Sequence, residues 1–64
     1  MVTLSYIHLD DPIHEETLTN RNDAIKRAKK LQAAYSSPGD FEFIEIRDSK
    51  TQAVLVTAEE FKAM

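Results

Sequence analysis

The chain has 64 residues, of which 42% are hydrophobic and 30% are charged, and its formal net charge is −3 at pH 7. This composition is typical of a globular domain rather than a disordered chain. The sequence contains no cysteine, which excludes disulfides and thiolate metal sites. No segment approaches the roughly 20 apolar residues that a membrane span requires, and the start of the chain lacks a signal-peptide pattern. We therefore expect a single domain, residues 1–64, that is cytoplasmic and has no membrane partner.

The charges are unevenly distributed. Residues 1–20 carry four acidic and no basic side chains, whereas residues 21–35 carry five basic side chains and one acidic. The negative total argues against general affinity for nucleic acids. A domain of this length buries only about 60% of its unfolded surface. Small domains of this kind often gain stability by oligomerising, so a homodimer is expected.

The first half of the chain predicts two strands and one long helix. Val2–Leu9 alternates like a strand, and the turn at residues 10–12 sends the chain back through a weaker strand at Ile13–Leu18. A helix is predicted over Asn20–Tyr35, with the first residue as its N-cap and Pro38 ending it. At about 100° per residue, its apolar side chains fall on one arc. They are Ala24, Ala28, Leu31 and Tyr35.

The second half predicts a hairpin and a short terminal helix. Phe41–Arg47 and Gln52–Val56 are apolar runs separated by a polar turn. Thr57 and Glu60 have the spacing of a capping box, which marks the start of a helix. The order of elements predicts an α+β two-layer sandwich. It has an antiparallel sheet of three to four strands in the order β-β-α-β-β, one long helix on one face and a short C-terminal helix. This order resembles small bacterial and phage ββαββ domains, and the resemblance is one of architecture.

Apolar residues on both faces of the third strand bear on function. In a regular strand, Phe41 and Phe43 point to one face, and Ile44 and Ile46 point to the other. Three explanations remain open: a bulge brings all four inside, the C-terminal helix covers the second face, or that face needs a partner. The third explanation predicts an interface. Its expected contact residues are Ile7, Leu9, Phe41 and Phe43.

Basic side chains on the long helix offer an alternative site. They lie opposite the apolar arc, where a solvated face is expected, but they could also grip phosphates. The nucleic-acid alternative rests on Arg21, Lys26, Arg27, Lys29 and Lys30.

Catalytic and metal-binding motifs are scarce. His8, Asp10 and His14 flank the first turn and are weak metal-ligand candidates, because they match no fixed metal motif. The sequence contains no glycine-rich phosphate loop, no G-x-S-x-G motif and no cysteine nucleophile. We therefore predict no enzymatic activity, no cofactor and no metal. The expected function is a small protein-binding or regulatory module that self-associates through a sheet face or edge.

Overall fold

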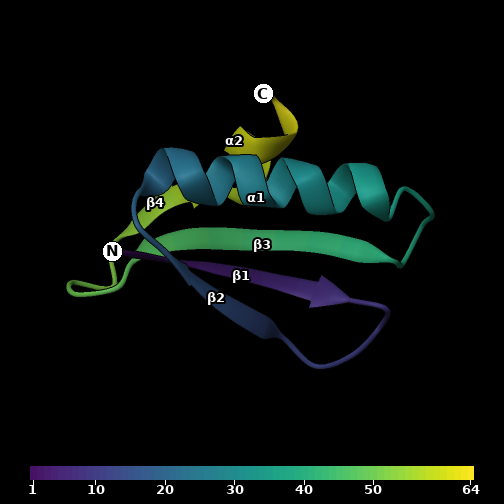
Figure 1. The fold of residues 1–64 in the computed structure, drawn as a ribbon, viewed down its shortest axis with the longest axis horizontal. Helices are drawn as coiled ribbons and strands as arrows, with labels where there is room; N and C mark the ends of the chain where they lie inside the picture. Colours follow the sequence, from purple (N-terminus) through teal and green to yellow (C-terminus); the bar gives the residue numbers. More distant parts are fainter.

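The computed structural model describes residues 1–64 and shows a two-layer α+β fold (Figure 1). The elements are β1 (Val2–His8), β2 (His14–Leu18), α1 (Arg21–Ala34), β3 (Phe41–Asp48), β4 (Val54–Thr57) and α2 (Ala58–Lys62). The four strands form one antiparallel sheet in the order β2-β1-β3-β4. This architecture confirms the predicted fold class.

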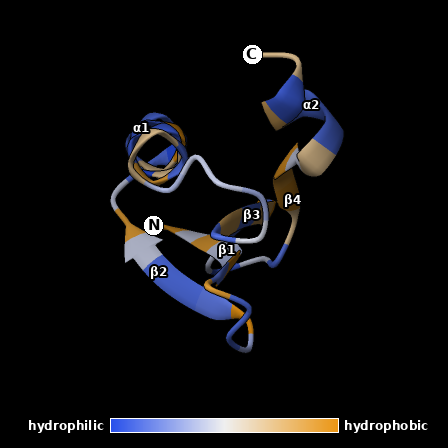
Figure 2. Ribbon diagram, turned by 90° about the vertical axis from the view of Figure 1, so that its right-hand side faces the viewer, coloured by the Kyte–Doolittle hydropathy of each residue, from blue (hydrophilic) through white to orange (hydrophobic).

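Both helices pack on the same face of the sheet. Viewed along α1 in Figure 2, α1 and α2 lie side by side above the strands, and the opposite face of the sheet carries no second layer. The core therefore lies between the sheet and the helices. Its fully buried members include Leu4 of β1, Ile46 of β3 and Val56 of β4, together with Ala24 and Ala28 of α1. The small alanine side chains let the helix approach the strands closely.

A bulge in β3 decides which apolar side chains face the core. Tyr6 pairs with Phe43 while its neighbour Ser5 pairs with Glu45, so β3 has one more residue than β1 at this point. The extra residue brings both Phe43 and Ile46 into the core. The expectation that these two side chains lie on opposite faces was therefore wrong, and the first of the three explanations holds for them.

Local signals fix both ends of α1. The side chain of Asn20 accepts a hydrogen bond from the backbone N–H of Asp23 at 2.9 Å, as expected for an N-cap. At the other end, the N–H of Tyr35 donates to the carbonyl of Leu31 at 2.9 Å. Of the predicted apolar arc, Ala24, Ala28 and Leu31 are buried and Tyr35 is half-buried.

The helix α2 closes the second half of the core. Its capping box forms as predicted, with reciprocal hydrogen bonds between Thr57 and Glu60. The helix then directs Phe61 onto Phe43, and the two rings stack with centroids 4.2 Å apart. Strand β4 begins two residues later than predicted, because Gln52 adopts a left-handed conformation (φ 65°) and still belongs to the turn.

Candidate interaction surfaces

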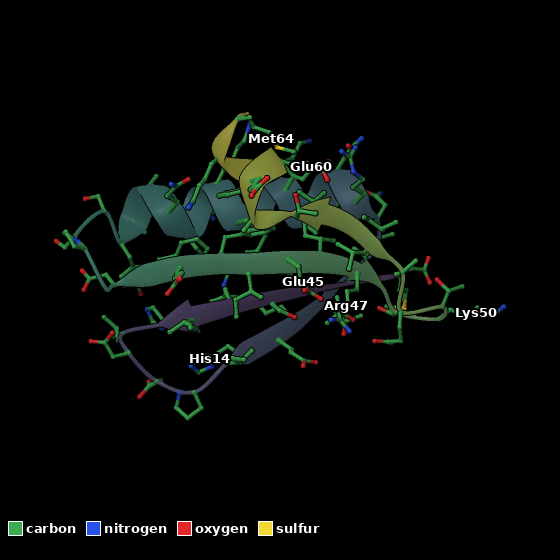
Figure 3. The ribbon with its side chains drawn as sticks, turned by 180° about the vertical axis from the view of Figure 1, so that it is seen from behind. His14, Glu45, Arg47, Lys50, Glu60 and Met64 are labelled. Atoms are coloured by element: carbon green, nitrogen blue, oxygen red, sulfur yellow. The ribbon has the colours of Figure 1, made fainter.

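The sheet face opposite the helices is a mixed polar and apolar surface. Thr3, Ser5 and Ile7 alternate along β1 with the buried Val2, Leu4 and Tyr6, and therefore point away from the helices. This face has a shallow depression of about 250 Å³. Its lining includes Ile13, Glu15, Ile44, Glu45 and Arg47. Figure 3 shows Glu45 and Arg47 together on the sheet, far from Glu60 and Met64 on the helical side. The two side chains form an ion pair.

Unusual backbone geometry marks the turn that follows β1. Leu9 and Asp10 both have positive φ angles, 54° and 59°, and the N–H of Asp11 donates to the carbonyl of His8 at 3.0 Å. This is the pattern of a type I′ turn, which favours glycine and asparagine. A second hydrogen bond, from the N–H of Leu9 to the carbonyl of Asp40 at 3.0 Å, ties the turn to the loop after α1. The leucine side chain is nonetheless 51% exposed.

Apolar side chains gather at this end of the sheet. Ile7 lies two residues before Leu9, and Ile13 lies opposite Ile7 if the β1–β2 register continues by one pair. Ile13 is 61% exposed, and Ile44 lines the same depression. We call these four residues, Ile7, Leu9, Ile13 and Ile44, the turn-end surface. Ile13 therefore does not anchor the core, although its residue type suggests that role.

The charges beside the turn-end surface are all negative, apart from the paired Arg47. They come from the β1–β2 turn, from β2, from the loop before β3 and from β3 itself. The acidic residues are Asp10, Asp11, Glu15, Asp40, Glu42 and Glu45. Basic side chains are absent from residues 1–20 and from residues 36–46.

The structure divides the predicted interface residues between the two faces. Ile7 lies on the open face and Leu9 lies in the turn next to it, whereas Phe41 and Phe43 lie on the helical side. The two phenylalanines and Phe61 line a groove of about 190 Å³ between α1 and α2. Phe43 is buried in the core under α2, so it does not contribute to an exposed sheet face.

A cluster of rings lies under the C-terminal end of α1. The ring of His8 packs edge-on against Tyr35, with centroids 4.3 Å apart, and lies 6.1 Å from the ring of His14. His14 in turn stacks on Tyr6 at 5.7 Å. Burial raises the pKa of the Tyr6 hydroxyl, and a hydrogen bond with Glu16 raises it further.

The candidate metal ligands are only partly brought together. The rings of His8 and His14 lie 6.1 Å apart in an edge-to-face arrangement, and a carboxylate oxygen of Asp11 lies 4.0 Å from Nε2 of His14. The carboxylate of Asp10 is instead directed toward Gly39 of the loop after α1. No group of three or more histidine, aspartate or glutamate side chains is arranged to hold a metal ion.

The basic residues of α1 form an exposed stripe with one exception. Arg21, Lys26, Lys29 and Lys30 are exposed. Arg27 is half-buried, and its Nε donates to Glu16 of β2 at 3.1 Å, so this guanidinium fastens the helix to the sheet. The remaining four cations are the residues available for the nucleic-acid alternative.

The two edges of the sheet differ in their side chains. Strand β2 carries Glu15 and Glu16 and follows Pro12, and both acidic residues and proline discourage pairing with another chain. Strand β4 and its flanks, residues 51–58, contain no charged residue and no proline. Val54 on this edge is 48% exposed. Strand β4 has a bulge between Val54 and Val56, and a bulge hinders pairing with another strand. The side chain of Val54 stays exposed despite this bulge.

Comparisons with known proteins give no relative: no protein-family model, no curated protein and no solved structure matches the chain. Neither helix is long and apolar enough to cross a membrane.

Sequence reasoning missed three residues of these surfaces. Ile13 was expected to anchor its strand because of its residue type, and Ile44 was assigned by strand period, which fails at the bulge in β3. Val54 could have been found from the sequence, because it lies in the longest uncharged segment of β-forming residues near the C-terminus.

Proposed function

We infer that the chain is a small non-enzymatic protein-binding module that self-associates by pairing its β4 edge with the β4 edge of a second copy. The observation that carries this proposal is the charge-free edge of β4, with Val54 exposed to solvent. An exposed edge strand presents unpaired backbone N–H and C=O groups, and an uncharged one lacks the charged side chains that commonly discourage pairing, which leaves the bulge in β4 as its protection.

Two-fold symmetry favours β4 over the other parts of the sheet. In a symmetric interface, each residue meets residues from the same patch of the second copy. Pairing of β2 with itself would bring Glu15 and Glu16 close to their own counterparts. Contact between the open sheet faces of two copies would likewise bring Glu15 and Glu45 close to the acidic side chains of the second copy. Like charges in opposed positions destabilise a strand pair, so β4 is the part of the sheet that self-pairs without this penalty.

Pairing through β4 also extends the existing sheet. The strand order β2-β1-β3-β4 places β4 at the edge farthest from β2. Two copies joined there form one continuous sheet, with all helices on one face if the two-fold axis is perpendicular to the sheet. This arrangement leaves the turn-end surface of each copy free.

The proposal is tested by light scattering over a range of protein concentrations, with two matched lysine variants. Val54→Lys places a charge on β4, and Thr17→Lys places the same charge on the exposed β2 edge. We expect the unmodified protein and Thr17→Lys to dimerise with equal affinity, and Val54→Lys to be monomeric. A monomer at every concentration, or a dimer that Thr17→Lys disrupts and Val54→Lys does not, would contradict the proposal.

The nucleic-acid alternative uses the exposed stripe of α1. Arg21, Lys26, Lys29 and Lys30 all point to solvent, and this is the observation that supports it. A gel-shift assay at low salt tests it directly, with Lys26, Lys29 and Lys30 replaced by glutamate as the control. Binding that weakens steeply with salt and disappears in the control would support the alternative over self-association as the main activity.

A further inference from the structure

Leu9 is a poor choice for the position it occupies. A left-handed backbone conformation crowds the Cβ atom of any L-residue other than glycine, and asparagine tolerates it better than leucine. Leu9 has a φ of 54°, and its apolar side chain is 51% exposed. Folding therefore gains little from leucine here. Strained residues of this kind tend to occur at functional sites.

The surroundings of Leu9 have the character of a contact surface. Ile13 is even more exposed than Leu9, and Ile7 and Ile44 lie on the same side of the sheet, which neither helix covers. Sheets commonly bury such a face under a helix. The depression between Ile13 and Ile44 gives the face a slight concavity, about 250 Å³ in volume.

Charge indicates which kind of helix would fit. Glu15 and Glu45 line the depression, and Glu42 pairs with Ile7 in the β1–β3 register. Asp10 and Asp11 follow Leu9 in the turn. The one basic residue on this face, Arg47, is already paired with Glu45. An apolar centre with an acidic rim is complementary to an apolar stripe with basic flanks.

We propose that the turn-end surface binds a basic amphipathic helix of a partner protein. The leucine or isoleucine stripe of that helix contacts Ile7, Leu9, Ile13 and Ile44, and its lysine or arginine side chains face the acidic rim. This is helix-in-groove recognition on an open sheet face. It goes beyond self-association and does not depend on it, because the β4 edge lies on the other side of β3 from β1 and β2.

A second copy of the chain does not match this surface. The basic stripe of α1 has the right charge, but the apolar arc of that helix is buried in its own core at Ala24, Ala28 and Leu31. A face-to-face pair would oppose the acidic rims. The occupant is therefore a helix of different sequence, with its apolar stripe exposed before binding.

The test uses a synthetic helical peptide with a leucine stripe flanked by lysines, and a second peptide with glutamate in place of each lysine. Titration into isotope-labelled protein is followed by amide chemical shifts. We expect the basic peptide to shift resonances of the turn-end surface, with an affinity that falls as salt is added. The acidic peptide is expected to bind at least tenfold more weakly.

Three variants locate the site. Leu9→Asn should weaken the basic peptide at least fivefold while the protein stays folded, because asparagine suits the turn. Met64→Asn is the matched control, since Met64 is 50% exposed but lies on the helical side, and it should leave the affinity unchanged. Val54→Lys should also bind normally, which separates this proposal from self-association.

Each contrary outcome overturns the inference. No binding of the basic peptide, equal binding of the acidic peptide, or no effect of Leu9→Asn would each contradict it. Shifts confined to the groove lined by Phe41, Phe43 and Phe61 would assign the binding to that groove instead. Shifts confined to the exposed stripe of α1 would assign it to the basic face.

Discussion

Phe61 of α2 stacks on Phe43 of β3, with ring centroids 4.2 Å apart and ring planes inclined by 14°. This contact joins the end of the chain to the middle of the sheet. It places α2 beside α1 on one face, so the helical layer is complete and the other face stays open. The open face carries part of the proposed turn-end surface.

Loss of this stacking should be severe for the fold. Phe61 is only 6% exposed, and replacing a buried phenylalanine with alanine typically costs about 3–5 kcal/mol. We expect Phe61→Ala to lose most of the free energy of unfolding in urea denaturation. Met64→Ala, at an exposed position close by, should change it by less than about 0.5 kcal/mol. Similar stabilities for the two variants would show that α2 does not close the core.

Leu9→Asn should make the protein more stable. The substitution places a residue that tolerates the left-handed conformation at a φ of 54° and removes an exposed apolar side chain. We expect a gain of about 0.5–1 kcal/mol in the free energy of unfolding. Ile13→Asn, which is also exposed but has no positive φ, should give no comparable gain. A loss of stability in Leu9→Asn would contradict the strained geometry assigned to the turn.

Stability at acid pH should depend on Asp48. Its carboxylate accepts hydrogen bonds from the backbone N–H groups of Thr51 and Lys50 at 2.9 and 2.8 Å, and these lower its pKa from the ordinary value of 3.8. A carboxyl group with a lower pKa in the folded state stabilises the fold fully above its unfolded pKa. That contribution is lost as the pH falls from about 3.8 through the folded pKa.

The variant Asp48→Asn isolates this effect. It keeps a side-chain oxygen that can accept the same hydrogen bonds but cannot carry the charge. Melting temperatures measured from pH 7 down to pH 2 should show the unmodified protein as the more stable of the two at neutral pH. The difference should shrink below the ordinary aspartate pKa. A difference that stays constant over this range would show that the charge of Asp48 does not contribute.

The features predictable from the sequence were those set by local signals. Asn20 caps α1 and Thr57 caps α2 because these bonds form within one turn of the same helix. The arc of Ala24, Ala28 and Leu31 was also readable, since a helix of this length keeps a regular period. The order of the six predicted elements, together with this apolar arc, was enough to predict a two-layer fold.

Features set by pairing between distant strands were not predictable in the same way. The extra residue at Ile44 depends on how β1 and β3 align, and a shift of one residue exchanges the two faces. For this reason, Phe43 was expected at an exposed face and lies in the core. Leu9 was expected on the same strand face as Ile7, but the strand ends at His8, and Leu9 adopts a left-handed conformation in a turn that is tied to Asp40.

The most direct test of self-association through β4 is a distance measurement between spin labels. The chain has no cysteine, so Val54→Cys and Thr17→Cys each carry a single label per copy. In a dimer joined at β4, roughly seven strand spacings of ~4.8 Å separate the two β2 strands, or about 34 Å. We predict a short distance between labels at position 54 and a distance near this larger value at position 17. A shorter distance at position 17 than at position 54, or no coupling at either position, would contradict the account.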